Sequence, residues 1–572
     1  MSIFEIHKFY SAMKKIIGLL TCFLVLNLTI SAQNNTVGLL SYDAPLSYEG
    51  FNLIYPHNQP SVFLLNSCGE IVHRWDDEPN FRPGNTAYIT EDGYLYKTKR
   101  NAAVAADPIW AGGGGAILEI RDWDNNLMWQ FEMNDSLNRL HHDFAITETG
   151  NIIALAWELK NVDECIAAGR DTSTLAQNEM WPDWVFEIDP FNDTIVWEWH
   201  AWDHLVQDFD ETKANFGVIA NEPGKIDVNY GREDGHPDWM HANALDYNPE
   251  LQQVMISVPY FDELWIIDKT TTTSEAAGSF GGFSGKGGDL MFRWGNPITY
   301  QNGTADDQTL FFQHDTHWID DHVSLGHPHY GKIAVFNNRV GTNYSTVNII
   351  NPIWDMYEWE YETNPNGTFE PQDFDVTRTH PDTTALYSTG LSSVQVLPNN
   401  NMLITSGRFG YSFELTPDNY VVWEYKTPIR MGAQATQGDS LTVNNNLTFR
   451  MDRYPLDYAA LDGKDLSPKG FIELEPDTTF CDRLTSIEEL LDESKFVLSP
   501  NPAFNTVSVE WYGMMKANIE IYTMNGVLVD KQDAVSGSRT YFDVSDWQKG
   551  IYLVTIRTDN KFYTRKLIIQ RG

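Results

Sequence analysis

Residues 185–189 (VFEID) and, after a turn, residues 197–199 (WEW) form the pattern that decides the fold. An apolar strand that carries an acidic or amide side chain is followed by a turn and by a second strand that ends near tryptophan. Six copies occur. Their first segments are 63–66, 117–120, 185–189, 264–268, 347–351 and 413–415, and their second segments end at or near Trp75, Trp129, Trp199, Trp294, Tyr361 and Tyr425.

Most copies follow a pair of shorter apolar strands, such as 87–89 with Leu95 and 394–396 with 403–404. Two opening and two closing strands make a four-stranded sheet, and such sheets repeated every few tens of residues are typical of propeller blades. The sequence therefore predicts an all-β protein with a six-bladed β-propeller over residues 36–480, in which both ends of the region share the ring closure. A tandem of sandwiches is the alternative, but it leaves the recurring tryptophan unexplained.

The composition narrows the class of protein. The net charge is −40 over 572 residues, which argues against nucleic acid as a partner because its phosphates are repelled. The 19 Trp and 26 Tyr fit aromatic packing between sheets. Cys68, Cys165 and Cys481 remain after the leader, so at most one disulfide forms and one thiol is left over.

The N-terminus reads as an export leader. Residues 13–15 (MKK) precede an apolar run from Ile16 to Ile30 and the small-residue exit 31–33 (SAQ), so residues 1–32 are expected to contain a signal peptide, with Met13 as the expected start. No later stretch is apolar enough to cross a bilayer, so no transmembrane segment is expected in the mature chain.

The C-terminus is a second unit. Short alternating strands are expected at 507–511, 517–522, 526–531, 539–544, 550–557 and 562–570. These indicate a small immunoglobulin-like antiparallel sandwich over residues 496–572, joined by a linker at 481–495. Residues 497–503 (VLSPNPA), 521–526 (IYTMNG), 549–554 (KGIYLV) and 566–571 (KLIIQR) together resemble the sorting domain of the type IX secretion system. That resemblance implies the secretion machinery as a partner and a secreted or cell-surface location.

Three histidines stand at one position of the repeat: His142 in 140–143 (LHHD), His241 in 238–243 (DWMHAN) and His314 in 312–315 (FQHD). Each is expected just before the first strand of a blade, which in propellers is the innermost strand. The side chains are therefore expected to meet in the central channel. Three imidazoles suit either a catalytic zinc with an open position or covalent catalysis by one of them.

The same segments, with 63–75 (FLLNSCGEIVHRW), 335–338 (VFNN) and 344–345 (YS), resemble the bacterial arylsulfate sulfotransferases over most of residues 37–450. The resemblance implies transfer of a sulfuryl group from a phenolic sulfate donor to a phenol acceptor, without 3′-phosphoadenosine phosphosulfate or another cofactor. His314 holds the position of the histidine that becomes a transient sulfohistidine. His142 and His241 match the other pocket histidines, and Asn243 lies beside His241 in the shared motif.

The sequence departs from the family at 256–260 (ISVPY), where the family carries an arginine. The reaction physically requires a fixed positive charge next to the negatively charged sulfuryl oxygens. Arg339 and Arg408, at the same offset in later blades, are the candidate replacements. Two alternatives stay open: a surface-displayed propeller that binds phenolic or glycan ligands without turnover, and a metal-dependent hydrolase that uses the same histidines.

Overall fold

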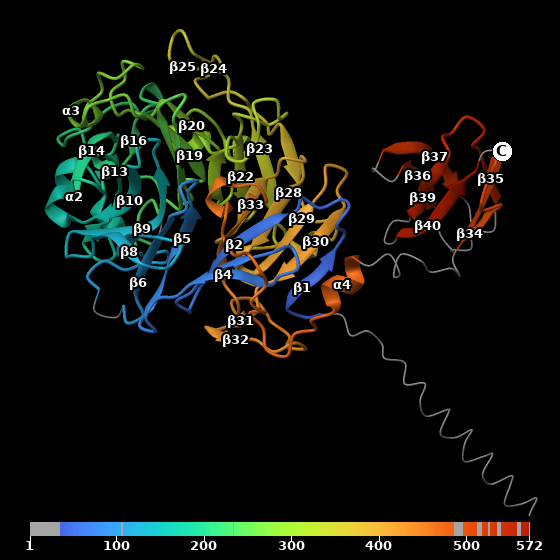
Figure 1. Cartoon of the computed structure of the whole chain (residues 1–572). Coiled ribbons are helices and arrows are strands. Elements are labelled where there is room, and N and C mark those ends of the chain that lie inside the picture. The colour runs from blue at the N-terminus through green and yellow to red at the C-terminus, as the bar shows by residue number, and fades with distance from the viewer. Residues whose placement is uncertain are drawn as a thin grey trace, which may run out of the picture.

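The structure is a computed structural model that describes residues 35–104, 107–232, 234–485, 496–511, 517–523, 527–534, 539–557 and 562–570. The predicted leader and residues 486–495 of the predicted linker lie outside these ranges. The protein is all-β, as predicted, with strands in 43% of the chain. Figure 1 shows one large body of sheets, the short helix α4 (Phe480–Thr485) at its edge, and a smaller group of strands at the C-terminus.

Within residues 35–485, six sheets contain four or five strands each. The first sheet is β33 (Thr448–Pro455), β2 (Gly50–Pro56), β3 (Val62–Leu65) and β4 (Ile71–Trp75). The second is β5 (Phe81–Ile89), β6 (Leu95–Asn101), β7 (Ile117–Arg121) and β8 (Leu127–Glu132). The third is β9 (Asn138–Ile146), β10 (Ile152–Glu158), β13 (Asp183–Asp189) and β14 (Thr194–His200).

The fourth sheet is β17 (Ala244–Asn248), β18 (Gln253–Val258), β19 (Glu263–Asp268) and β20 (Phe292–Trp294). The fifth is β21 (His314–Trp318), β22 (Ile333–Asn337), β23 (Thr346–Ile350) and β26 (Val376–Arg378). The sixth is β27 (Ser393–Val396), β28 (Met402–Ser406), β29 (Tyr411–Leu415), β30 (Val421–Lys426) and β1 (Gly38–Tyr42).

Short elements fill the connections. They are α2 (Val162–Ala168), α3 (Thr273–Ala276) and the strand pairs β11 (Lys160–Asn161) with β12 (Glu179–Met180), β15 (Leu205–Val206) with β16 (Ile226–Asp227), β24 (Trp354–Asp355) with β25 (Glu360–Tyr361), and β31 (Ile429–Arg430) with β32 (Ala433–Gln434).

The first strand of each sheet, beginning with β33 in the first sheet, is called its leading strand here, and the six leading strands form a closed ring. β33 contacts β5, and contacts then run from β5 to β9, β17, β21, β27 and back to β33. Both ends of the region take part in the closure: β33 comes from the end of the chain segment but heads the first sheet, and β1 from its start pairs with β30 at the edge of the sixth. Residues at the start of the leading strands therefore lie around one axis.

One closing segment was predicted wrongly. The sequence pattern assigned 359–361 to the outer edge of the fifth sheet, but β23 pairs there with β26, through Val347 with Arg378 and Ile349 with Val376. Trp359 instead stands at a turn with φ 55°, inside the hairpin of β24 and β25. A tryptophan followed by alternating polar and apolar residues is compatible with a short hairpin as well as with an edge strand, so the pattern alone did not distinguish them.

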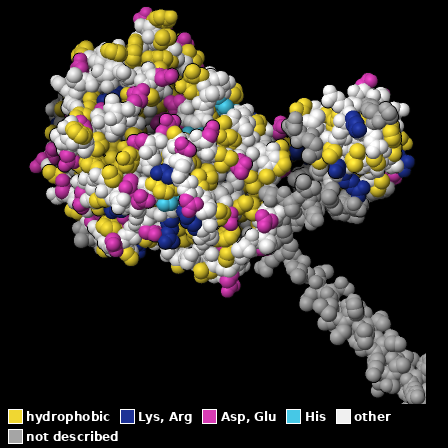
Figure 2. Space-filling view, viewed as in Figure 1, with side chains coloured by type: hydrophobic (Ala, Val, Ile, Leu, Met, Phe, Trp, Pro, Cys, Tyr) yellow, Lys and Arg dark blue, Asp and Glu magenta, His cyan; other side chains and the backbone are white. Residues whose placement is uncertain are grey.

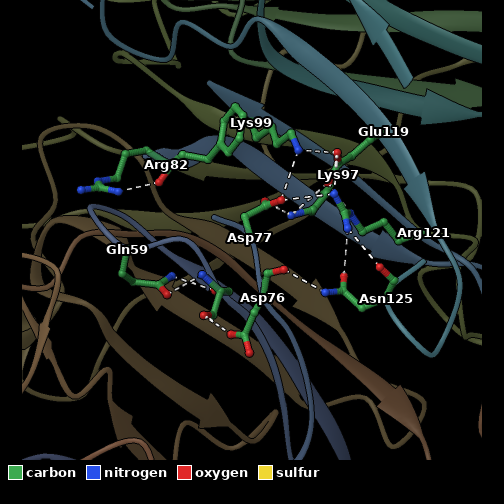
Figure 3. Close-up of polar contacts among 11 residues, drawn as sticks. Gln59, Asp76, Asp77, Arg82, Lys97, Lys99, Glu119, Arg121 and Asn125 are labelled. Carbon is green, nitrogen blue, oxygen red and sulfur yellow. Dashed lines mark hydrogen bonds and ion pairs between the residues drawn. The ribbon is translucent and has the colours of Figure 1, made fainter. Parts of the chain in front are cut away.

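A buried ionic cluster joins the first two sheets (Figure 3). Asp77, just after β4, bonds Lys97 and Lys99 of β6, and Glu119 of β7 lies 2.6 Å from Lys99 and 2.7 Å from Arg121. The side chains of Lys97, Asp77 and Glu119 are at most 2% exposed. Charges removed from water this completely require opposite charges within bonding distance, so the cluster fixes how the two sheets meet.

The C-terminal unit contains two sheets. One is β34 (Phe496–Ser499), β35 (Thr506–Trp511) and β38 (Arg539–Asp543), and the other is β37 (Leu528–Ala534), β36 (Ala517–Thr523), β39 (Gly550–Arg557) and β40 (Phe562–Ile569). Apolar side chains from both sheets, among them Phe496, Val509, Ile521 and Val554, share one core. The turn of the predicted strand pair at 524–526 lies outside the described residues.

Figure 2 shows acidic side chains scattered over the drawn face of the large body among hydrophobic and other residues, with fewer lysines and arginines, which agrees with the net charge of −40. Among the described residues, no helix is long and apolar enough to span a bilayer. Cys68 and Cys481 form the single possible disulfide, across 413 residues of sequence, and Cys165 is a buried free thiol. The disulfide ties α4 to the turn between β3 and β4, beside the strand pair that closes the ring.

Replacing both Cys68 and Cys481 with alanine should lower the free energy of unfolding by about 2–4 kcal/mol, because the crosslink restricts the unfolded chain. Urea unfolding of the oxidised wild type and of the double variant measures the difference. A reductant should destabilise the wild type and leave the variant unchanged. Equal unfolding curves for the two proteins would show that the disulfide does not stabilise the ring.

Candidate functional site

The three predicted histidines lie together at one end of the axis. His142 is on β9, His241 comes three residues before β17, and His314 begins β21, so three consecutive sheets each contribute one. The ring centroids of His142 and His241 are 4.6 Å apart. The Phe449 ring lies 6.2 Å from His142 and 6.4 Å from His314, which makes it the floor of a shared pocket.

Local backbone geometry turns the imidazoles toward this pocket. His142 and His241 have φ values of 48° and 58°, in the left-handed region that costs a non-glycine residue about 1–2 kcal/mol. Gly113 packs against His142, and a Cβ there would stand 1.9 Å from His142 Nε2. Its carbonyl accepts the His142 N–H at 2.9 Å. Gly113 therefore has no room for a side chain beside His142, and a Cβ on Gly112 would lie 3.8 Å from His241 Cε1, so this glycine segment borders both histidines.

His314 is held in one orientation and one tautomer. Asn338 donates its amide hydrogens to the carbonyls of Ser388 and Leu391, both at 2.9 Å, so its Oδ1 faces His314 and accepts the Nδ1 hydrogen at 2.8 Å. The lone pair of His314 Nε2 accepts the Leu391 N–H at 3.0 Å. Burial, with the nearby charges of His241 and Arg339, lowers the pKa of His314 to about 3 despite the Asn338 bond. The ring is therefore neutral, with its Nε2 lone pair available once Leu391 moves.

His241 is hydrogen-bonded to a carboxylate directly, and His142 is linked to one through His141. His241 Nδ1 bonds Asp238 Oδ2 at 2.6 Å, which leaves its Nε2 for the pocket. His142 Nδ1 lies 3.0 Å from His141 Nδ1, and His141 Nε2 lies 3.0 Å from Asp183. Burial, followed by the charges of His241 and His141, holds the pKa of His142 well below its ordinary value. His142 is therefore an uncharged hydrogen-bonding group rather than a cation.

Asn243 is tied to the same pocket through the backbone. Its amide nitrogen donates to the carbonyl of Gln313 at 2.8 Å, directly before His314, and its Oδ1 is buried without a hydrogen-bond partner among the described residues. Gln313 in turn donates to the Glu263 carbonyl at 2.6 Å. Asn243 therefore links the His241 and His314 segments.

The two candidate arginines flank His314. The Arg339 guanidinium lies 3.6 Å from the centre of the Phe312 ring, and its Nε donates to the Thr389 carbonyl at 3.0 Å. Arg408 donates to Asn444 Oδ1 at 3.0 Å. A Cβ on Gly390 would stand 3.6 Å from Arg408 Nη2 and 3.8 Å from His314 Cε1. Segment 389–391 thus brings both cations to the edge of the pocket.

Two further residues at the pocket escaped the sequence analysis. Arg232, from the insertion at 201–237, lies 4.3 Å from the centre of the Tyr260 ring and 3.7 Å from Asp238. It therefore places a positive charge beside the segment in which the family arginine is missing. His57 is half-buried and lies close enough to His142 for its charge to affect the pKa of that residue. Removal from water, followed by the Arg100 charge, lowers the pKa of His57 to about 4. His57 follows the second strand of its sheet, and Arg232 lies in a long insertion. Neither position recurs from repeat to repeat, so the repeat pattern could not identify these residues.

Solved structures resemble the chain only distantly. A protein of unknown function from Bacteroides caccae is 10% identical with a TM-score of 0.37, and the match covers 66% of this chain and 94% of that one. Virginiamycin B lyase from Staphylococcus aureus is 8% identical with a TM-score of 0.29, covering 64% and 94%. No curated protein matches the chain.

Family profiles match both units of the chain. The secretion system C-terminal sorting domain matches residues 498–570, which indicates export and a secreted or cell-surface location. The arylsulfotransferase (ASST) profile matches residues 52–445, a range that contains all three histidines, Asn243 and both candidate arginines. The chain belongs to the arylsulfotransferase family.

Proposed function

We propose that the protein is a secreted aryl-sulfate sulfotransferase that moves a sulfuryl group between phenolic compounds through a sulfohistidine at His314, without 3′-phosphoadenosine phosphosulfate. The observation that supports the proposal is the state of His314: buried, neutral, and held at Nδ1 by Asn338, which leaves Nε2, now accepting the Leu391 N–H, as the unprotonated ring nitrogen. We also infer that the six sheets are the blades of a six-bladed propeller and that the C-terminal sheets form an immunoglobulin-like sandwich. The cycle of leading strands and the shared core support these inferences.

In the first half of the reaction, His314 Nε2 attacks the sulfur of the donor. The N–S bond forms, the S–O bond to the aromatic ring breaks, and the donor leaves as a phenolate that takes up a proton. Because the attack makes the imidazole ring positive, the bond from Nδ1–H to Asn338 becomes stronger as charge develops. Leu391 must release Nε2 before the attack, and its N–H is then free to donate to a sulfuryl oxygen.

In the second half, an acceptor phenol loses its proton, and its oxygen attacks the same sulfur. The O–S bond forms, the N–S bond breaks, and His314 returns to the neutral state. The rings of His142 and His241 are placed to donate to sulfuryl oxygens or to accept the phenol proton. Arg339, Arg408 and Arg232 supply the fixed positive charge for the anionic ligand.

Binding of phenolic or glycan ligands without turnover is the second candidate function. It is favoured by the engaged lone pair of His314, which accepts the Leu391 N–H, and by Tyr260 in the segment in which the family has arginine. The two functions differ in whether a covalent intermediate forms.

Replacing His314 with glutamine should abolish transfer from p-nitrophenyl sulfate to phenol, whereas His142→Ala and His241→Ala should each lose about 2.7–4 kcal/mol of transition-state stabilisation. His329→Gln, in a loop away from the pocket, is the matched control. Mass spectrometry of protein incubated with donor alone should find one added sulfuryl group on the peptide that contains His314. Transfer by the His314 variant, or an active enzyme with no adduct, would contradict the proposed nucleophile.

The pH dependence should reflect the lowered pKa of His314. A histidine with a pKa of about 3 stays unprotonated through the mildly acidic range, so kcat/KM for the donor should change by less than about twofold between about pH 7.5 and pH 5. The loss should come only as the pH approaches 3, where protonation removes the lone pair. Initial rates of nitrophenol release at saturating phenol measure the profile. An inflection near pH 6.5 would show that an unshifted histidine controls the step.

Deleting residues 496–572 should prevent release from the cell or display on its surface while the remainder keeps its fold, because the C-terminal unit has its own core. Fractionation of the native host, with immunodetection in the periplasm, the outer membrane and the medium, measures the location. A variant with the tail intact but His314 replaced is the control and should be exported normally. Unchanged export of the truncated chain would show that the tail is not the sorting signal.

A further inference from the structure

A cavity of about 590 Å³ lies on the same axis as the histidines but at another level of the ring. Residues from all six leading strands line it, including Tyr88, Phe144, Leu245, Trp318 and Val394. None of the three pocket histidines is among the lining residues. Its volume falls within the range of small-molecule sites, about 300–1,000 Å³. The ring therefore encloses a second compartment large enough for a ligand.

Consecutive residues of β33 separate the two compartments. The Phe449 ring faces His142 and His314, whereas Arg450 lines the cavity. Arg450 donates to Asp143 at 3.0 Å and to Asp315 at 2.7 Å, so it closes the axis between the two levels. A ligand in the cavity is thus held apart from the histidine pocket.

The cavity wall carries eight carboxylates and a single arginine. Arg450 is already neutralised by Asp143 and Asp315, which leaves the other acids without a cation. The side chain of Asp452, two residues after Arg450 on β33, forms no hydrogen bond or salt bridge with any described residue, and burial raises its pKa to about 6 although the Arg450 charge lowers it. Burial and the neighbouring Asp321 raise the pKa of Asp320 to about 7. A bound cation would relieve this uncompensated negative charge.

A polar group without a partner also faces the cavity. Thr316 is 1% exposed and lines the cavity, and its hydroxyl has no hydrogen-bond partner within the described chain. Leaving a buried hydroxyl unpaired is unfavourable, so a native structure normally supplies it with a partner. This hydroxyl is independent of the acidic side chains and offers a hydrogen-bonding group to a ligand with polar atoms.

Aromatic side chains also contribute to the wall, beside aliphatic ones. Tyr247, Trp318, Tyr330, Tyr454 and Tyr458 line the cavity together with Tyr88 and Phe144. Ring faces attract organic cations. Hard metal ions instead require six to eight converging oxygen ligands. Among the described residues no group of three or more His, Cys, Asp or Glu is placed to hold a metal ion. Carboxylates that are spread out between aromatic rings suit an organic cation, whose charge is distributed over several atoms, better than a metal ion.

We propose that this acidic and aromatic cavity is a binding site for an organic ammonium ligand, separate from the histidine pocket. The ammonium group would lie near Asp452, Asp320 and Asp321, its carbon substituents would lie against the aromatic rings, and a polar atom would pair with the Thr316 hydroxyl.

Isothermal titration calorimetry of the purified full chain with benzyltrimethylammonium tests the cation site. One saturable site is expected, and Asp321→Asn combined with Asp452→Asn should weaken binding at least tenfold. The exposed Asp418, in the turn between β29 and β30, provides the matched control, and Asp418→Asn should bind as the wild type does. His314→Gln should also bind normally, because the two compartments are separate. Thermal unfolding of every variant verifies that it is folded.

Benzyl alcohol and calcium chloride are the companion probes. The neutral alcohol should bind far more weakly than the ammonium, and calcium should not displace the ammonium stoichiometrically. Absence of saturable ammonium binding, equal binding of the alcohol, or unchanged affinity in the folded double variant would overturn the proposal. Stoichiometric calcium binding that excludes the ammonium would overturn it in favour of a metal site.

Discussion

Hydrogen bonds from one leading strand to the next hold the ring together. In each case a side chain on one sheet accepts a backbone N–H of the following sheet. The pairs are Asp143 with Leu245, Asp246 with Trp318, Asp315 with Val394, Gln395 with Arg453 and Tyr454 with Ile89. Intramolecular hydrogen bonds contribute about 0.5–1.5 kcal/mol each, and about 1.5–3 kcal/mol where the acceptor is a charged carboxylate. Leaving the buried N–H groups unpaired would cost about 1–3 kcal/mol each. The sheets are therefore fixed to one another as well as packed.

The same contacts also position the histidines at the axis of the ring. Asp143 and Asp315 directly follow His142 and His314, so the residue that holds the neighbouring sheet also sets the place of the histidine before it. The left-handed backbone at His142 and at Asp315 is stable only because these contacts fix it. A substitution of Asp143 or Asp315 would therefore disturb both the ring and the pocket, and would be a poor probe of catalysis by itself.

Sequence reasoning located the strands wherever an apolar segment, a turn and a second segment recur in register, and it located the histidines because they share an offset in that repeat. It failed at 359–361, where a local hairpin imitates an edge strand. It also missed Asn338 as the partner of His314, although 335–338 was among the motif residues. Arg232 and His57 reach the pocket only through tertiary contacts. The cavity beyond Phe449 depends on how six strands converge, which no single repeat encodes.

The two levels of the axis have opposite electrostatic character for one physical reason. Burial disfavours any charge that lacks a partner, so His142 and His314 stay neutral, and Arg232, Arg339 and Arg408 bring positive charge to the edges of their pocket. At the other level the clamping carboxylates gather around the axis, and Arg450 neutralises only two of them. The two proposals follow this difference, with an anion beside the neutral nitrogen of His314 at one level and a cation among the carboxylates at the other. The contacts that close the ring therefore also create the difference in charge along its axis.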